Sequence, residues 1–206
     1  MPTELFSIHS DNPQKRMIAL IANKIREGAV ITFPTDSGYS IGTALDNKRG
    51  VEKIRKIRKL SKGHDFTLLI GSFANIGEFA KLDNNAFRLM KRVTPGPYTF
   101  ILEATKQVPN RLVHPRKKTI GIRLSSNIFV QNLLLELFEP LMSVSLIIDN
   151  QEFSNAQDVF DLLKNKVDIV IDSGNCPSIP TTVLDFTKTL MNLLERGREI
   201  HQQSSD

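Results

Sequence analysis

Apolar residues recur along the chain with two different periods, which predict alternating helices and strands. Over residues 17–25 they follow a helical spacing. The preceding Asp11-Asn12-Pro13 can cap a helix that begins at the proline, and Gly28 can end it. The β-branched run 29–33 predicts a short buried strand, which Pro34 closes. The chain therefore opens with a helix that leads into a strand.

The same alternation continues along the rest of the chain. A second amphipathic helix is predicted at 51–60, because apolar residues recur there every third position between basic ones. The remaining predicted elements are helices at 84–92, 127–138 and 155–164 and strands at 66–70, 98–103, 118–124, 141–148, 167–172, 181–186 and 190–195. Two pairs of successive strands have no helix between them, which requires antiparallel pairing. We therefore expect an α/β fold with one mixed, twisted sheet and flanking helices.

Length and composition fit this picture and add a charge. The chain has 206 residues, of which 40% are hydrophobic, so one domain with a substantial core is expected. We place that domain at 1–200 and a flexible C-terminal tail at 201–206. The 27 Lys and Arg residues exceed the 22 Asp and Glu residues by five. A positive protein favours anionic partners such as nucleotides, RNA or acidic metabolites, without selecting among them.

The single cysteine and the hydropathy of the chain indicate in which cellular compartment the protein is expected. Cys176 is the only cysteine, so an intramolecular disulfide is excluded, and no Cys/His set has zinc spacing. We expect no metal site formed by the protein alone. The first residues lack the pattern of a secretory signal, and no apolar run approaches the roughly 20 residues that span a bilayer. The expectation is a soluble, cytoplasmic protein that does not contact membranes.

Common phosphate-binding motifs are missing, so a phosphate site must be built from other segments. The chain has neither a G-x-x-x-x-G-K-[ST] loop nor a G-x-G-x-x-G turn. The first candidate is the segment from Pro34 to Tyr39, which collects hydroxyls and a carboxylate where a buried strand ends. The alternative is a plain turn with an aromatic residue packed beneath it, and the spacing alone favours that alternative.

A second candidate is the basic segment 55–59 at the end of the predicted helix. A solvated basic face is the usual explanation of such a run. Lys56 and Arg58 stand two positions apart, so in a continuous helix they point to different sides. Both can reach one ligand only if the helix ends near Lys56. The segment 111–118 is also basic and is either a phosphate-contacting patch or a solvated loop.

Two predicted strands carry polar residues on one face. Thr119, Gly121 and Arg123 alternate along the first, so the arginine follows a glycine that lets a neighbour approach the backbone. The alternative is an arginine on an edge strand that reaches solvent. Ser143 and Ser145 share a face of the second strand, which is otherwise apolar. Their hydroxyls must either bond the backbone or line a pocket.

Taken together, these segments resemble the YrdC/YciO family, and its YciO branch most closely. The resemblance spans nearly the whole chain, and the matching segments occur in the same order. They are Ala29–Tyr39, the K-x-R pair Lys56/Arg58, Thr94–Phe100, Thr119–Arg123, Ser143–Ser145 and Thr181–Asp185. The resemblance implies a twisted, mixed α/β sheet around a large, positively lined cavity.

The resemblance also implies an activity, the synthesis of L-threonylcarbamoyladenylate from ATP with Mg²⁺, L-threonine and bicarbonate or CO2. This product serves the N6-threonylcarbamoyl modification of tRNA adenosine, and no permanently bound cofactor is expected. By motif, the residues implied to hold threonine or its carbamate are Thr35, Arg123, Ser143 and Thr181. Those implied to face the nucleotide are Lys56, Arg58, Thr119 and Ser145, and the first two are the candidate catalytic cations.

Two other functions stay open. The first is a protein that binds double-stranded RNA, tRNA or the ribosome without making an adenylate, which the net positive charge and the basic segments favour. The second is a carbamoyl or adenylyl transfer to another amino acid or small amine.

Two positions depart from the pattern of the synthases in this family. Ile147 stands where the family has the asparagine of Ser-x-Asn, and Glu195 stands where it has the arginine of Arg-x-Gly. Loss of the amide costs on the order of 1–3 kcal/mol of binding if a polar group of the nucleotide loses its partner. We expect low or altered activity with ATP.

Overall fold

The computed structural model describes residues 2–61, 63–177, 179–187 and 192–195. The strands are β1 (Glu4–Ser7), β2 (Ile31–Thr35), β3 (Gly38–Ala44), β4 (Thr67–Leu69), β5 (Tyr98–Glu103), β6 (Thr119–Arg123), β7 (Leu141–Ser145), β8 (Ile147–Ile148), β9 (Gln151–Glu152), β10 (Ile169–Asp172), β11 (Thr182–Asp185) and β12 (Asn192–Glu195). The helices are α1 (Lys15–Arg26), α2 (Lys48–Ile57), the 3₁₀ turn η1 (Phe73–Asn75), α3 (Ile76–Phe79), α4 (Asn84–Val93), α5 (Ile128–Leu137) and α6 (Ala156–Leu163).

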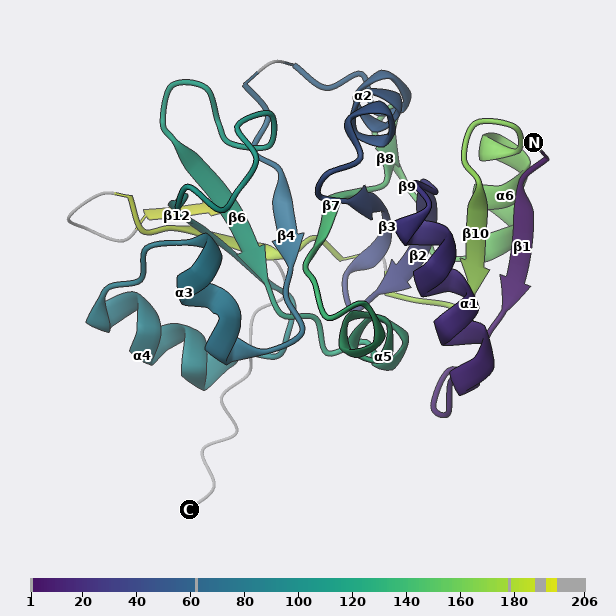
Figure 1. Cartoon of the computed structure of the whole chain (residues 1–206), viewed down its shortest axis with the longest axis horizontal. Helices are drawn as coiled ribbons and strands as arrows, with labels where there is room; N and C mark the ends of the chain where they lie inside the picture. Colours follow the sequence, from purple (N-terminus) through teal and green to yellow (C-terminus); the bar gives the residue numbers. More distant parts are fainter. Residues whose placement is uncertain (1, 62, 178, 188–191, 196–206) are drawn as a thin grey trace.

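Within this part of the chain, ten strands form one mixed sheet in the order β1-β10-β2-β3-β7-β4-β6-β5-β11-β12 (Figure 1). The two antiparallel pairs that the sequence required are confirmed, because β5 pairs antiparallel with β6 and β11 with β12. Parallel pairs join β1 to β10, β10 to β2, β4 to β6 and β5 to β11. The expected α/β fold with a mixed sheet and flanking helices is therefore confirmed.

Three of the described strands escaped the sequence prediction, namely β1, β3 and the two-residue strand β9. In β1 only Phe6 is buried, so the segment carries little apolar signal. In β3 the glycines and the serine have low strand propensity. Gly42 is nevertheless required there, because a Cβ atom at this position would lie 2.5 Å from the carbonyl oxygen of Met142 on the neighbouring strand β7.

Some boundaries differ from the prediction. Helix α1 begins at Lys15 rather than at Pro13, and its N-cap residue makes no side-chain capping bond. The Asp11 carboxylate accepts a hydrogen bond from Ser10 Oγ instead. The strand predicted at 141–148 breaks at Leu146, so that β8 leaves the main sheet and pairs with β9. The first residues of the strand predicted at 190–195 lie outside the described residues, which include 192–195. The predicted tail at 201–206 also lies outside them.

The hydrophobic core forms two clusters, one on each side of the sheet. Val170 and its neighbour Ile171 belong to different clusters, as expected when side chains alternate between the faces of a strand. Buried residues of α1 and α5 complete one cluster, and those of α2, α3, α4 and α6 complete the other. None of the described helices is both long and apolar enough to cross a membrane. Because helices cover both faces of the sheet, a binding site is expected at the ends of the strands.

Candidate functional site

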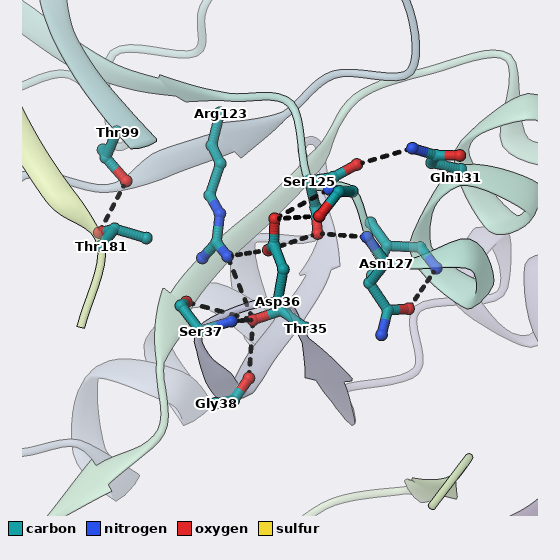
Figure 2. Close-up of polar contacts among 12 residues, drawn as sticks. Thr35, Asp36, Ser37, Gly38, Thr99, Arg123, Ser125, Asn127, Gln131 and Thr181 are labelled. Carbon is teal, nitrogen blue, oxygen red and sulfur yellow. Dashed lines mark hydrogen bonds and ion pairs between the residues drawn. The ribbon is translucent and has the colours of Figure 1, made fainter. Parts of the chain in front are cut away.

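A buried ion pair lies where β2 and β6 end (Figure 2). Arg123 is the last residue of β6, and only 4% of it is exposed. Its Nη2 atom donates hydrogen bonds to Asp36 Oδ1 and, at 3.2 Å, to Thr35 Oγ1. Thr35 is the last residue of β2, and Asp36 follows it in the turn to β3. The alternative that the arginine reaches solvent from an edge strand is wrong, since β6 lies between β4 and β5.

The Asp36 carboxylate is held by further donors from the segment after β6. Ser125 Oγ donates to Oδ1 at 2.7 Å, and the backbone nitrogen and Oγ of Ser126 both donate to Oδ2 at 2.9 Å. Burial raises the pKa of this carboxyl group, but the charge of Arg123 and the bonds from both serines outweigh burial and hold the pKa below its ordinary value. Asp36 is therefore ionised, and both of its carboxylate oxygens accept hydrogen bonds in this network.

The guanidinium of Arg123 binds Asp36 and Thr35 through Nη2 alone. Burial lowers the pKa of Arg123, and the charge and hydrogen bond of Asp36 oppose that effect. An arginine stays protonated in proteins even so. Its Nε–H group is buried and has no hydrogen-bond partner among the described residues. Buried donors are almost always paired, so an unpaired one is unusual, and Arg111 Nε is the other such atom among the described residues.

The turn that presents Asp36 is rigid. Thr35 Oγ1 donates to the carbonyl oxygen of Gly38 at 2.7 Å and accepts from the backbone nitrogen of Ser37 at 3.1 Å. Gly38 has a φ of +112°, which favours glycine. Tyr39 packs beneath the turn, and its hydroxyl donates to a backbone oxygen of β10. The segment is thus the turn over a buried aromatic that the spacing favoured, and that turn also supplies a carboxylate.

A pocket of about 60 Å³ opens beside this turn. Its walls include Ser37, Ser145, Ile147, Glu152 and Thr181. Ser145 and Thr181 belong to the expected site, and Thr99 Oγ1 donates to Thr181 Oγ1 at 3.1 Å (Figure 2). This pocket is smaller than the large cavity that the resemblance implies. A pocket of about 580 Å³ lies elsewhere, between α4 and the ends of β5 and β11, and none of the expected site residues lines it.

The K-x-R pair lies at the end of α2. This helix ends at Ile57, and Arg58 is its C-cap residue. The helix therefore ends near Lys56, which is the condition for both cations to reach one ligand. Arg58 Nε donates to the carbonyl oxygen of Ser145 at 2.6 Å, so Arg58 borders the pocket. Burial lowers the pKa of Arg58. Lys56 is exposed. The structure thus brings Arg58 to the site and leaves Lys56 on the solvent side of the helix end.

Thr119 lies at the other end of β6 from Arg123, about 13 Å away for four residues of extended strand. It is fully buried, and its Oγ1 donates to Asp65 Oδ1 at 3.0 Å. Between them, Gly121 admits a protein neighbour rather than a ligand. A Cβ atom there would lie 2.7 Å from Thr67 Oγ1 on the adjacent strand β4.

The remaining residues that the sequence singled out lie in different environments. Ser143 is buried in β7, opposite residues of both β3 and β4. Glu195 is the last residue of β12. In the basic segment 111–118, Arg111 Nη2 donates to the carbonyl oxygen of Leu45. Arg55 Nη2 in turn donates to the carbonyl oxygen of Arg111 at 3.1 Å. Both of these cations bind backbone oxygens and so stabilise the fold.

The residues that hold Arg123 in place could not be predicted from the sequence. The sequence shows Asp36 only as the carboxylate of a turn, and it indicates no role for Ser125 and Ser126. The two serines directly precede Asn127, which caps α5 by accepting a hydrogen bond from the backbone nitrogen of Val130 at 3.1 Å. A run of small polar residues before an apolar helix is typical of a helix N-terminus and needs no further explanation.

No cluster of three or more His, Cys, Asp or Glu side chains suited to a metal ion occurs in the described ranges.

Comparison with known proteins places this geometry in a family. The family model Sua5_yciO_yrdC, described as "Telomere recombination", matches residues 23–197. The protein YciO of Escherichia coli K12 is 45% identical over 197 residues, which cover 95% of this chain and 96% of the relative. A threonylcarbamoyl-AMP synthase of Pyrococcus abyssi is 28% identical over 184 residues, which cover 87% of this chain and 54% of that protein.

Solved structures agree with these relatives. The crystal structure of E. coli YciO superposes with a TM-score of 0.92 at 42% identity and covers 95% of this chain and 96% of that one. P. abyssi Sua5 complexed with L-threonine gives a TM-score of 0.88 at 25% identity, over 95% of this chain and 58% of that one. The match of the family model over most of the chain and the 45% identity to YciO show that the chain belongs to the Sua5/YciO/YrdC family.

Proposed function

We propose that the protein binds L-threonine and ATP and joins them through bicarbonate or CO2 as L-threonylcarbamoyl-AMP. The observation that carries this proposal is Arg123, a buried guanidinium fixed by Asp36 and Thr35 with its Nε–H still unpaired among the described residues. A planar guanidinium is suited to a carboxylate, which is the group that every amino acid presents. The hydroxyls of Ser145 and Thr181 on the nearby pocket wall suit a polar side chain or a carbamate.

The reaction balances without a nucleophile from the protein. The threonine nitrogen forms a bond to the carbon of CO2 and loses a proton, which gives a carbamate. A carbamate oxygen then attacks the α-phosphorus of ATP. The bond from that phosphorus to the bridging oxygen breaks, and pyrophosphate leaves with the electron pair. Such a transfer needs positioning and compensation of charge, which fixed cations supply.

The nucleotide would lie on the side of the pocket next to the K-x-R pair. Arg58 already borders this side, and Lys56 can swing from solvent toward a phosphate as a flexible point charge. A pocket of about 60 Å³ is small beside the roughly 300–1,000 Å³ of typical ligand sites. We therefore place the phosphates outside it, near the end of α2. Mg²⁺ would enter bound to ATP, as part of the substrate. Thr119 and Ser143 remain predicted contacts.

The related proteins support binding of L-threonine more directly than binding of ATP. P. abyssi Sua5 has been crystallised with L-threonine, and the relative of that organism is named a threonylcarbamoyl-AMP synthase. The more similar YciO carries no such name. Ile147 on the pocket wall supports weak or altered use of ATP, because the synthases of this family have an asparagine there. We propose a reducing cytoplasm as the compartment and tRNA modification as the pathway.

The test is an assay of the purified chain with ATP, Mg²⁺, L-threonine and bicarbonate. We expect pyrophosphate and L-threonylcarbamoyl-AMP, both identified by mass spectrometry, and neither when threonine or bicarbonate is omitted. Titration calorimetry should detect L-threonine binding by the wild type and none by Arg123→Ala. The matched control is Arg92→Ala, which removes an exposed arginine of α4. If neither threonine binding nor pyrophosphate is detected, the proposal is wrong.

The alternative, RNA binding without adenylate synthesis, has weaker support in the described residues. Arg55 and Arg111 in the two basic segments are held by backbone oxygens. RNA binding should weaken steeply as salt rises. RNA retention with that salt dependence, together with no pyrophosphate release, would favour the alternative.

A further inference from the structure

Helix α5 exposes apolar residues on the side that faces away from the core. All but three of its ten residues are apolar, the exceptions being Gln131, Asn132 and Glu136. One side packs against α1 in the core. The uncovered side carries all three polar residues, but it also exposes Ile128 and Leu135. These exposed apolar side chains can be covered by a partner.

That uncovered side borders a groove between α4 and α5. Gln131, Leu134, Leu135 and Phe138 follow the i, i+3, i+4, i+7 spacing, so they form one stripe along α5. Two adjoining pockets of about 430 Å³ and 120 Å³ share Leu134 and Leu135 in their walls. We call them together the α4–α5 groove. On its other side, Phe87 of α4 lies edge-on to Phe73, with ring centroids 5.1 Å apart.

A large, exposed apolar side chain lies beside this groove. Phe138 is 86% exposed and Leu135 is 62% exposed. Phe138 is the C-cap residue that follows α5, and its φ of 56° is an outlier for a bulky side chain. Large exposed apolar patches on a protein that is otherwise charged mark interaction sites. A protruding ring next to a ligand-sized recess makes this surface complementary to itself.

Charges at the two ends of the groove have opposite sign. Lys91 of α4 lines one pocket and Glu139, just after α5, lines the other. Neither has a salt bridge within the described part of the chain. A two-fold axis through the groove would bring each lysine opposite the glutamate of the other copy. Such a surface contacts its own equivalent, which is the arrangement of most dimers.

We propose that the α4–α5 groove is a homodimer interface. Phe138 of each copy inserts into the groove of its partner, and Lys91 pairs with Glu139 across the axis. The interface reaches the candidate active site through Ser125, which lines the groove. Its Oγ donates to Asp36, and its carbonyl oxygen accepts from Gln131 Nε2 at 3.1 Å (Figure 2). This proposal does not depend on the proposed reaction.

Sedimentation velocity of the full chain from about 1 to 100 µM tests the proposal, because a dimer responds to concentration. We expect a species of twice the 23.2 kDa chain mass to grow with concentration. Phe138→Asp should raise the dissociation constant by about tenfold or more, as truncation of a central aromatic does. The control Leu20→Asp changes an exposed leucine of α1 and should leave the dimer intact.

A charge-reversal cycle identifies the geometry without touching the core. Lys91→Glu and Glu139→Lys should each weaken the dimer, and the double variant should restore it to within about threefold of the wild type. These exposed side chains leave the fold unchanged, which circular dichroism verifies. A chain that stays monomeric over the whole range overturns the proposal, including the case in which another protein occupies the groove. A dimer that is insensitive to Phe138→Asp and to the charge reversals overturns it as well.

Discussion

Asp36 and Arg123 are in hydrogen-bond contact although their strands are four positions apart in the sheet. In a flat sheet, the four steps from β2 to β6 would separate the strands by about 19 Å. The contact is possible because the sheet twists, which brings the ends of β2 and β6 together. The ion pair therefore ties two distant parts of one sheet as well as shaping the candidate site.

The first prediction concerns stability. Asp36→Asn removes the charge that balances a buried guanidinium, and breaking such a pair by one partner costs about 3–5 kcal/mol. We expect the free energy of unfolding in urea to fall by that amount. The matched control is Asp149→Asn, which breaks the exposed ion pair to Lys59 and should leave the unfolding midpoint unchanged. Equal effects of the two substitutions would contradict a special role for the buried pair.

The same pair predicts a pH dependence with a definite sign. The pKa of Asp36 is lower in the folded state than its ordinary value of 3.8. The ionised carboxylate therefore stabilises the fold fully above the unfolded-state pKa, and this contribution is lost as the pH falls through the folded-state pKa. Urea midpoints measured between about pH 6 and 2 should fall more steeply for the wild type than for Asp36→Asn. Parallel curves would show that Asp36 does not carry this dependence.

Arg123→Lys tests the geometry of the guanidinium rather than its charge. A lysine ammonium is a point charge and lacks the planar fork that can hold Asp36 and a ligand carboxylate together. We expect L-threonine to bind about tenfold or more weakly, which corresponds to about 1.4 kcal/mol or more. Calorimetry measures this, with Arg92→Lys on the exposed side of α4 as control. Unchanged affinity would mean that Arg123 does not grip the ligand.

Ile147→Asn tests the wall of the pocket that departs from the family pattern. An amide at this position can pair a polar group of the nucleotide, so ATP affinity should rise by up to about tenfold. Ile148→Asn is the control, because side chains alternate along β8 and Ile148 packs against the core instead. Fluorescence titration with a labelled ATP analogue gives both affinities. An equal gain in the two variants would contradict our account of this position.

Cys176 gives a prediction about chemical reactivity. Burial raises the pKa of its thiol to about 11, so only about one molecule in a thousand carries the reactive thiolate at pH 8. We expect a thiol reagent to label the folded protein at least about a hundredfold more slowly than the urea-unfolded one. Because Cys176 is the only cysteine, the signal reports one site. Comparable labelling rates in the two states would show that the loop around it opens freely.

The order of helices and strands could be predicted because each strongly periodic segment buries its own apolar face. The helix at 84–92 and the strand at 98–103 are examples, and the structure has α4 at Asn84–Val93 and β5 at Tyr98–Glu103. Strand β3 could not be predicted, because its small residues are required by the close approach of β7 rather than by local preference.

The candidate site was predictable only in part. Arg123 and Thr35 stand out as polar residues at the ends of apolar strands, and the structure brings them together. Asp36 and Ser125 are 89 residues apart in the sequence, and their contact depends on the strand order and on the twist of the sheet. No local pattern encodes either of these. Thr119, by contrast, lies on the expected strand but at its far end.

The position of β10 decides when the sheet can be completed during synthesis. Strand β10 lies between β1 and β2 and pairs with both, yet it comes from residues 169–172. A ribosome adds about 5–20 residues per second, so the first strand waits on the order of 10–35 s for its only neighbour in the described sheet. During that time β1 and one edge of β2 are unpaired and open to wrong partners. A nascent chain of this protein therefore needs protection until almost all of it has been made.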